Sequence, residues 1–310
     1  MNTRNALLTA AFCCTNMMSM AQNTDVISCL EIFDMETRTH KVIKEFPYLI
    51  EAPNWTPDGK FLVFNSKGKL YKLPVENPSA EAEEIFTGEA QNCNNDHVIS
   101  ANGKFIAISN TPKGGNASLI YTLPFEGGEP KQITPIGPSY LHGWSNDMTT
   151  LAYCAFRENQ NGADIYVMPV NGGAEKQLTD APGLNDGPEY SPDDKHIWFN
   201  SVRTGLMQVW RMNADGSEQT QMTFDEDLNA WFPHISPDNQ QVVYICYHKG
   251  DLEPGEHLPN KNVMLRLIPA QGGTPETLVE LFGGQGTINV NSWAPDSKRF
   301  AYVSYKLVEK

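Results

Sequence analysis

The chain has 310 residues, of which 40% are hydrophobic and 19% charged, and its formal net charge is −14 at pH 7. This hydrophobic content is enough for a packed core and excludes a disordered chain, and the length fits one large all-β domain. The negative charge disfavours binding to nucleic acid or to an anionic membrane surface. No apolar run reaches the roughly 18 residues of a membrane span.

Residues 1–21 have the pattern of a secretory signal peptide. Arg4 provides a positive start, residues 6–14 are apolar, and Ser19-Met20-Ala21 matches a cleavage site with small residues at its ends. A lipoprotein-type cleavage is the alternative, but the residue before Cys13 is bulky, so we favour simple cleavage. The sequence therefore predicts an exported protein, periplasmic or extracellular.

A short turn motif then recurs through the chain. Its proline presets the second position of a β-turn, an Asp or Asn follows, and an apolar strand comes next. The aligned positions are separated by 44, 45, 46, 45 and 58 residues. They are Asp58, Asn102, Asp147, Asp193, Asp238 and Asp296.

A second, glycine-containing turn repeats in step with the first, at Gly128, Gly173, Gly216 and Gly273. A period in the forties with four strands per repeat is typical of a β-propeller. We therefore predict an all-β, six-bladed propeller with four antiparallel strands in each blade.

The two ends of the chain are expected to share the last blade. Residues 25–45 match the second half of a blade, whereas Trp293 and the strand Phe300–Tyr305 match the first half. Pairing these segments would remove open sheet edges. It would make residues 22–310 a single domain, in which only the polar loop His248–Asn262 departs from the repeat. Such a loop is either a functional element or a tolerated insertion.

The segments before the inner strands should ring one mouth of the central channel. At three aligned positions they carry carboxylates, amides, imidazoles and aromatic rings. These candidate ligand-binding residues are Glu51, Asn95, His97, Tyr140, His142, Asp186, Glu189, Trp231, His234, Asn289 and Asn291.

The candidate residues allow three interpretations. His97, His142 and His234, with Glu189, could hold a divalent ion such as Mn²⁺, Zn²⁺ or Ca²⁺. Alternatively, the amide, carboxylate and aromatic groups could bind a polar ligand such as a sugar or a peptide end. The third interpretation is that all these groups bond only to strand backbone and channel water.

Other chemistry has little support in the sequence. Gly143-Trp-Ser-Asn-Asp147 departs from a nucleophile elbow, and no zinc-protease, phosphate-loop or dinucleotide motif occurs. The four cysteines after residue 21 are irregularly spaced, which argues against a metal cluster.

The repeated turn, together with an apolar strand and a glycine pair, resembles the TolB-type propeller family, whose WD40-like repeat is called PD40. The clearest matches are Trp55–Lys60, Ile165–Gly173 and Tyr190–Lys195. The resemblance covers nearly all of the chain from Asp25 onward. It implies the architecture and says little about activity. TolB itself carries an α/β domain ahead of its propeller and works in the periplasm with envelope partners, and this chain has no room for that domain.

Two other families have similar propellers. Prolyl-oligopeptidase-type enzymes add a hydrolase domain, which this sequence lacks. Oligogalacturonate lyase binds a metal through histidines and a glutamine on a seven-bladed ring and cleaves pectic fragments by β-elimination. Its ligands cannot be matched residue by residue to this chain.

These observations favour an exported binding or scaffolding module rather than an enzyme. Its partner would be an envelope protein or a polar ligand, carbohydrate or peptide, at the channel mouth. The alternative is a metal-dependent, lyase-like enzyme acting on uronate oligosaccharides.

Overall fold

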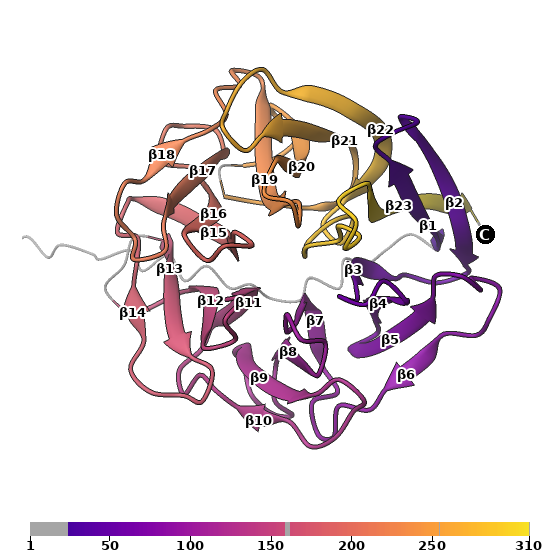
Figure 1. Ribbon diagram of the computed structural model, residues 1–310, viewed down its shortest axis with the longest axis horizontal. Coiled ribbons are helices and arrows are strands. Elements are labelled where there is room, and N and C mark those ends of the chain that lie inside the picture. The colour runs from indigo at the N-terminus through magenta and orange to yellow at the C-terminus, as the bar shows by residue number, and fades with distance from the viewer. Residues whose placement is uncertain (1–23, 159–161, 254, 310) are drawn as a thin grey trace, which may run out of the picture.

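The computed structural model describes residues 24–158, 162–253 and 255–309. In these ranges the regular structure consists of strands without a helix, and so no described helix could cross a membrane. The sheets are arranged around a common centre (Figure 1). This arrangement confirms the predicted all-β propeller class. The predicted signal peptide lies outside the described residues.

Three sheets consist of four consecutive antiparallel strands each. The first contains β3 (Glu51–Trp55), β4 (Phe61–Ser66), β5 (Lys69–Pro74) and β6 (Glu83–Ile85). The second contains β7 (Cys93–Ile99), β8 (Phe105–Asn110), β9 (Leu119–Pro124) and β10 (Lys131–Gln132). The third contains β19 (Leu228–Ile235), β20 (Gln241–His248), β21 (Pro259–Pro269) and β22 (Glu276–Gly284). The first strand of each sheet faces the centre and the last lies at the rim (Figure 1).

A fourth sheet has eight strands, because the first strand of one set of four pairs with the third strand of another set. One set is β11 (Ser139–Trp144), β12 (Thr150–Ala155), β13 (Gly162–Pro169) and β14 (Lys176–Gln177), and the other is β15 (Gly183–Tyr190), β16 (His196–Ser201), β17 (Gln208–Asn213) and β18 (Thr220–Gln221). A short parallel pairing of Gly162 with Gly183 joins them. A side chain on Gly162 would overlap the carbonyl of Gly183, so only glycine allows this approach.

The last sheet has three strands, in the order β2 (Thr39–Phe46), β1 (Thr24–Asp34) and β23 (Arg299–Glu309). As predicted, the N-terminal strand pairs with the C-terminal one, from Thr24 opposite Glu309 to Asp34 opposite Arg299. The segment before β23 forms an isolated bridge from Trp293 to Phe300, and its carbonyls at Ser292 and Thr287 accept backbone N–H groups of β23.

The strand pairing therefore corrects the prediction of six separate four-stranded sheets. The described strands form five sheets: three of four strands, one of eight and one of three. The physical reasons are the glycine contact between β13 and β15 and the irregular pairing of the segment around Trp293 with β23.

The recurrent turn motif is held by one hydroxyl group. In the turn at Ser191, the hydroxyl donates to Asp193 Oδ1 at 2.7 Å and accepts the backbone N–H of His196 at 3.0 Å. The same pair of bonds recurs from Thr56, Ser100, Ser145 and Ser236. The hydroxyl thus connects the end of one strand to the start of the next, which explains why the motif repeats.

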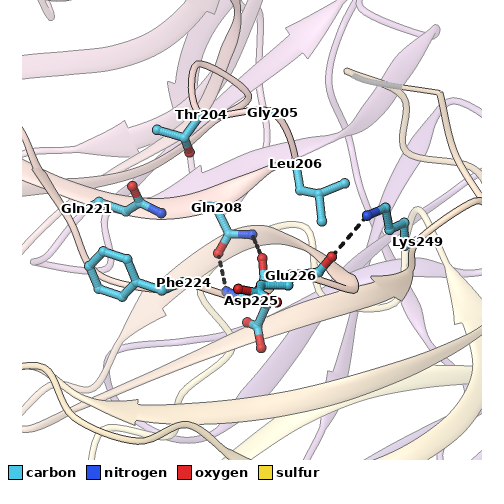
Figure 2. A pocket seen from close by; sticks show the side chains of 9 residues that line it. All are labelled: Thr204, Gly205, Leu206, Gln208, Gln221, Phe224, Asp225, Glu226 and Lys249. Atoms are coloured by element: carbon cyan, nitrogen blue, oxygen red, sulfur yellow. Dashed lines mark hydrogen bonds between the residues drawn. The ribbon is translucent and has the colours of Figure 1, made fainter.

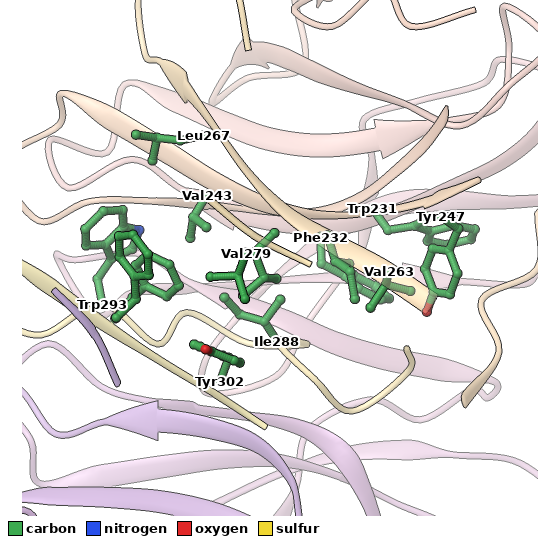
Figure 3. Close-up of a cluster of buried hydrophobic side chains, with 14 of the residues drawn as sticks. Trp231, Phe232, Val243, Tyr247, Val263, Leu267, Val279, Ile288, Trp293 and Tyr302 are labelled. Carbon is green, nitrogen blue, oxygen red and sulfur yellow. The ribbon is translucent and has the colours of Figure 1, made fainter. Parts of the chain in front are cut away.

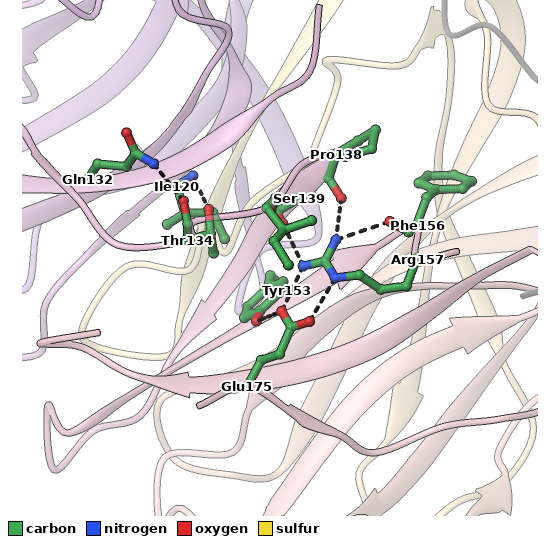
Figure 4. Close-up of polar contacts among 10 residues, drawn as sticks. Ile120, Gln132, Thr134, Pro138, Ser139, Tyr153, Phe156, Arg157 and Glu175 are labelled. Atoms are coloured by element: carbon green, nitrogen blue, oxygen red, sulfur yellow. Dashed lines mark hydrogen bonds and ion pairs between the residues drawn. The ribbon is translucent and has the colours of Figure 1, made fainter. Parts of the chain in front are cut away.

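Buried polar groups fasten neighbouring strands. Thr134 Oγ1 accepts the backbone N–H of Ile120 at 2.8 Å, and Arg157 makes an ion pair of 2.7 Å with Glu175, which also accepts from Tyr153 (Figure 4). These contacts join strands within one sheet or its loops.

A large apolar core joins the third four-stranded sheet to the closing sheet. Trp231 and Phe232 of β19 belong to the same cluster as Phe300 and Tyr302 of β23 (Figure 3). Phe33 of β1 stacks on Phe300 with ring centroids 5.1 Å apart. The four described cysteines are free and buried.

The closing sheet also contains a buried carboxylate, Glu31, which is 5% exposed. It accepts hydrogen bonds from Tyr302 Oη at 2.9 Å and Ser304 Oγ at 2.5 Å on β23, and its Oε2 lies 2.7 Å from His40 Nδ1 on β2. One side chain on the middle strand therefore ties both neighbours together.

We predict that Glu31→Ala lowers the free energy of unfolding by about 2–4 kcal/mol, because the buried Tyr302 hydroxyl loses its acceptor. Chemical denaturation monitored by circular dichroism measures this loss. The matched control is Glu45→Ala, which removes an exposed ion pair to Lys306 in the same sheet and should leave stability nearly unchanged. Equal losses in the two variants would contradict the role of Glu31.

Candidate functional site

The five inner strands β3, β7, β11, β15 and β19 are each interrupted by a register shift at a similar place, where the predicted mouth residues lie. The shifts fall after Glu51, Cys93, Leu141, Asp186 and Trp231. At three of them the next residue has positive φ: Ala52 (55°), Gly187 (62°) and Phe232 (50°). Such bulges break the alternation of side chains and redirect them, which here brings polar groups together.

Four side chains from four parts of the chain form what we call the central cluster: Asp96, His142, Asp186 and Asn289. His142 Nε2 lies 3.2 Å from Asp186 Oδ1 and 3.9 Å from Asp96 Oδ1. Asn289 Nδ2 donates to Asp96 Oδ1 at 3.1 Å. All four are buried, at 2–7% exposure.

The charges in the central cluster stabilise one another. Burial disfavours the imidazolium, but Asp96 and Asp186 outweigh it and raise the pKa of His142 to about 9. Burial likewise opposes ionisation of Asp186, yet His142 lowers the pKa of that carboxyl to about 2. Burial, with repulsion from Asp186, raises the pKa of Asp96. The imidazole therefore carries a positive charge at neutral pH, next to at least one carboxylate.

Aromatic rings and one loop cover the central cluster. Phe232 stacks on His142 with centroids 5.6 Å apart. His257 packs edge-on against both Trp231 (4.8 Å) and Phe232 (5.2 Å). Burial lowers the pKa of His257, although Asp186 partly offsets this effect.

His257 belongs to the covering loop, Lys249–Leu258, which is described except for residue 254. This loop is shorter than the predicted 248–262, because β21 begins at Pro259 and pairs with Gly284. Tyr247 Oη donates to the carbonyl of Leu258 at 3.2 Å. The loop is thus anchored at its end and places an imidazole beside the central cluster.

Glu189 and His234 form a separate, fully bonded pair. His234 Nδ1 lies 2.6 Å from Glu189 Oε2, and its Nε2 lies 2.9 Å from the carbonyl of Ile288. Glu189 Oε1 accepts from the Asn291 side chain at 2.6 Å and from the backbone N–H of Ile235 at 2.9 Å. These contacts brace β15, β19 and the segment before β23, and they leave the imidazole no free nitrogen for a metal.

Glu51 lies on the first inner strand, next to the central cluster. Asn65 Nδ2 donates to its Oε2 at 3.2 Å. Burial raises the pKa of Glu51 from 4.5 to about 7, with a contribution from Asp96, whereas Asn65 and Asn95 oppose the shift. A carboxyl with this pKa changes its charge near neutral pH.

The remaining predicted residues have other surroundings. His97 is fully buried, and burial lowers the pKa of its imidazole to about 4, so the ring is neutral at pH 7. Tyr140 is half-buried and contacts Phe156 edge-on, with centroids 6.4 Å apart.

The three predicted metal-binding histidines, His97, His142 and His234, do not share a set of partners. Among the described residues, no group of three or more His, Cys, Asp or Glu side chains is arranged to hold a metal ion. His142 contacts carboxylates that favour its protonated form, and a protonated imidazole cannot coordinate a metal ion. The donor groups therefore do not fit the metal site that the lyase interpretation requires.

Sequence reasoning missed Asp96, Phe232 and His257. Asp96 and Phe232 follow mouth residues that were selected, but strict alternation would point them away from the centre. The bulges instead turn the side chains of Asp96 and Phe232 toward the central cluster. His257 belongs to a loop whose path could not be inferred from the repeat.

A hollow lies away from the central cluster, beside β17 and β18. It has a volume of about 560 Å³ and is lined by Thr204, Gly205, Leu206, Gln208, Gln221, Phe224, Asp225, Glu226 and Lys249 (Figure 2). Gln208 and Asp225 bond to each other there, and Lys249 donates to the carbonyl of Glu226 at 3.3 Å. Its polar groups are thus partly engaged with one another.

The fold and the central cluster define a β-propeller with a polar centre, and comparison with known proteins gives its family. A model of the TolB beta propeller domain (PD40) matches residues 142–266. The uncharacterized protein Atu1656 of Agrobacterium fabrum is 47% identical over 283 residues, covering 91% of this chain and 94% of that protein. The chain belongs to this family of TolB-like β-propellers.

Solved structures agree on the fold. A protein from Agrobacterium tumefaciens described as a candidate TolB superposes with a TM-score of 0.85 at 46% identity, covering 92% of this chain and 99% of that one. Oligogalacturonate lyase from Vibrio parahaemolyticus gives a TM-score of 0.50 at 14% identity, covering 92% of this chain and 98% of that one, which shows the fold alone.

The Tol-Pal system protein TolB of Francisella tularensis is 24% identical over 210 residues, or 66% of this chain. The chain spans only 47% of the length of that TolB.

The raised pKa of His142 predicts a loss of stability in alkaline solution. An imidazole whose pKa rises from 6.5 to about 9 on folding contributes fully below pH 6.5, and its contribution is lost as the pH rises through 9. The expected loss is up to about 3 kcal/mol. Thermal unfolding between pH 6 and 10 should show it in the wild type and not in His142→Gln. His248→Gln, at an exposed position, is the control, and a His142→Gln profile parallel to the wild type would refute the assignment.

The raised pKa of Glu51 predicts a second dependence of the protein's stability on pH. Because folding raises its pKa from 4.5 to about 7, its contribution to stability is present below pH 4.5 and is lost as the pH rises through 7. Glu51→Gln should therefore gain stability relative to the wild type between pH 5 and pH 8, by up to about 3 kcal/mol. Melting curves at the two pH values test this. A gain of the same size in the exposed variant Glu83→Gln would show that the effect does not come from burial.

Proposed function

We propose that this chain is an exported, TolB-like propeller that acts as a binding or scaffolding module, with its partner docking over the central cluster. The observation that carries the proposal is the convergence of buried polar groups from separate sheets, with His142 between two carboxylates and an orphaned amide oxygen on Asn289. Stability alone does not require such a group, since apolar residues of similar volume serve as well or better.

The family supports the same role. The Francisella relative is named as a protein of the Tol-Pal system, and the match covers two-thirds of this chain. By analogy, the partner here would be an envelope protein, or a polar carbohydrate or peptide ligand, met outside the cytoplasm after removal of residues 1–21. The lyase reaction is not proposed, because the described donors do not form a metal site.

We further infer that the six sequence repeats form six radial units within one domain, residues 22–310, with the eight-stranded sheet contributing two of them. This arrangement would place the eleven predicted mouth residues around one opening. The predicted ligand-binding role of that set stays a prediction.

Site-specific photo-crosslinking tests the docking face. A photoreactive phenylalanine analogue replaces Tyr140, which is half-buried on the strand that carries His142, or Lys195, which is exposed in the turn after β15. Crosslinking in intact cells should give a defined envelope adduct from position 140 and not from position 195. Adducts from position 195 alone would place the docking face elsewhere.

A further inference from the structure

The central cluster contains more negative than positive groups. Asp96 and Asp186 flank His142, and Glu51 lies close enough to Asp96 for the two charges to interact. The largest influences on these three carboxyls include two bases, His142 and His257, and no lysine or arginine. A buried carboxylate without a matched cation is costly.

Three buried amide oxygens in the cluster and its surroundings have no hydrogen-bond donor. Asn289 is 2% exposed; its amide nitrogen donates to Asp96, whereas its amide oxygen has no partner. Asn65 and Asn54 show the same pattern, since their nitrogens donate to Glu51 and to the carbonyl of Asn291 while their oxygens lack partners. In each case the acceptor fixes the orientation of the amide, because a flip would set two oxygens against each other.

Unused acceptors beside an excess of carboxylates call for a ligand that brings both donors and positive charge. We propose that the ligand of the central cluster presents a cationic nitrogen, an ammonium or a guanidinium, to Asp96, Asp186 and the amide oxygen of Asn289. This inference rests on the proposed binding role and names the chemistry that the site recognises.

The surroundings strengthen such a contact. Trp231 and Phe232 are fully buried beside the cluster, so a charge pair formed there would be weakly screened by water. An anionic ligand, such as a uronate, would be repelled by the Asp186 carboxylate and would bring no donor to the amide oxygen of Asn289. Aliphatic chains ending in a cation occur both in lysine and arginine side chains of proteins and in free amines.

Isothermal titration calorimetry with matched probes tests the proposal. Cadaverine and agmatine are the cationic probes, pentanediol is the neutral control and glutarate the anionic one, all at constant ionic strength. Peptides with a central lysine, arginine or norleucine separate a protein source from a free amine. We expect binding of at least one cationic probe or peptide and none of its uncharged or anionic counterparts.

Variants then locate the site. Asp186→Asn and Asp96→Asn should weaken cation binding at least about tenfold. Asp225→Asn, which removes a carboxylate paired with Arg266 away from the cluster, should leave it unchanged. Asp96 is the second test should Asp186→Asn fold poorly, since its contact with His142 is longer, at 3.9 Å.

The outcomes separate this inference from the proposed function. Equal binding of cationic and neutral probes, or cation binding that both variants retain, would overturn the cationic ligand. Failure of every cationic probe, with the position-140 crosslink intact, would overturn it as well but leave the docking role standing. Loss of the crosslink with cation binding retained would mean that the site takes a small amine rather than a protein partner.

Discussion

The architecture depends on the pairing of β1 with β23. These strands come from opposite ends of the chain, and every residue from Thr24 to Asp34 has a partner between Arg299 and Glu309. Without it, β1 and β23 would both have open edges, which invite aggregation. The pairing also brings Phe33 onto Phe300, and so connects the closing sheet to the core that contains Trp231 and Phe232.

That core in turn positions the polar centre. Phe232 is held at positive φ by a bulge, its N–H donates to Asn200 Oδ1 at 3.0 Å, and its ring lies on His142. Trp293 Nε1 donates to the carbonyl of His234 at 3.0 Å, next to the Glu189 pair. Backbone strain of this kind persists only where the surroundings enforce it. The central cluster is therefore preorganised by packing rather than assembled from mobile loops.

Much of the fold could be predicted because its signals are local. The hydroxyl of Ser191 and the carboxylate of Asp193 act within one turn, so the repeat is visible in the sequence. The link between Gly162 and Gly183 was not predictable, because nothing in a single glycine shows which backbone will approach it. The same distinction between local and non-local signals applies to the residues of the site. His142 and Asp186 were found by alignment of the repeats, whereas Asp96 required the bulge.

His234 shows the limit of residue type as a guide. A histidine next to a carboxylate at a channel mouth has the chemistry of a metal ligand, but its two nitrogens are already bonded to Glu189 and to the carbonyl of Ile288. Only the contacts in the folded structure distinguish a histidine that joins strands from one that could bind a metal.

The antiparallel pairing of the chain ends has a mechanical consequence. Thr24 and Glu309 are direct neighbours at one end of the closing sheet. A force that draws the two termini apart would load their hydrogen bonds one after another, like a zipper, instead of shearing the whole row at once. A load applied at Thr24 and Glu309 would thus separate β1 from β23 one residue pair at a time and open the ring at the closing sheet.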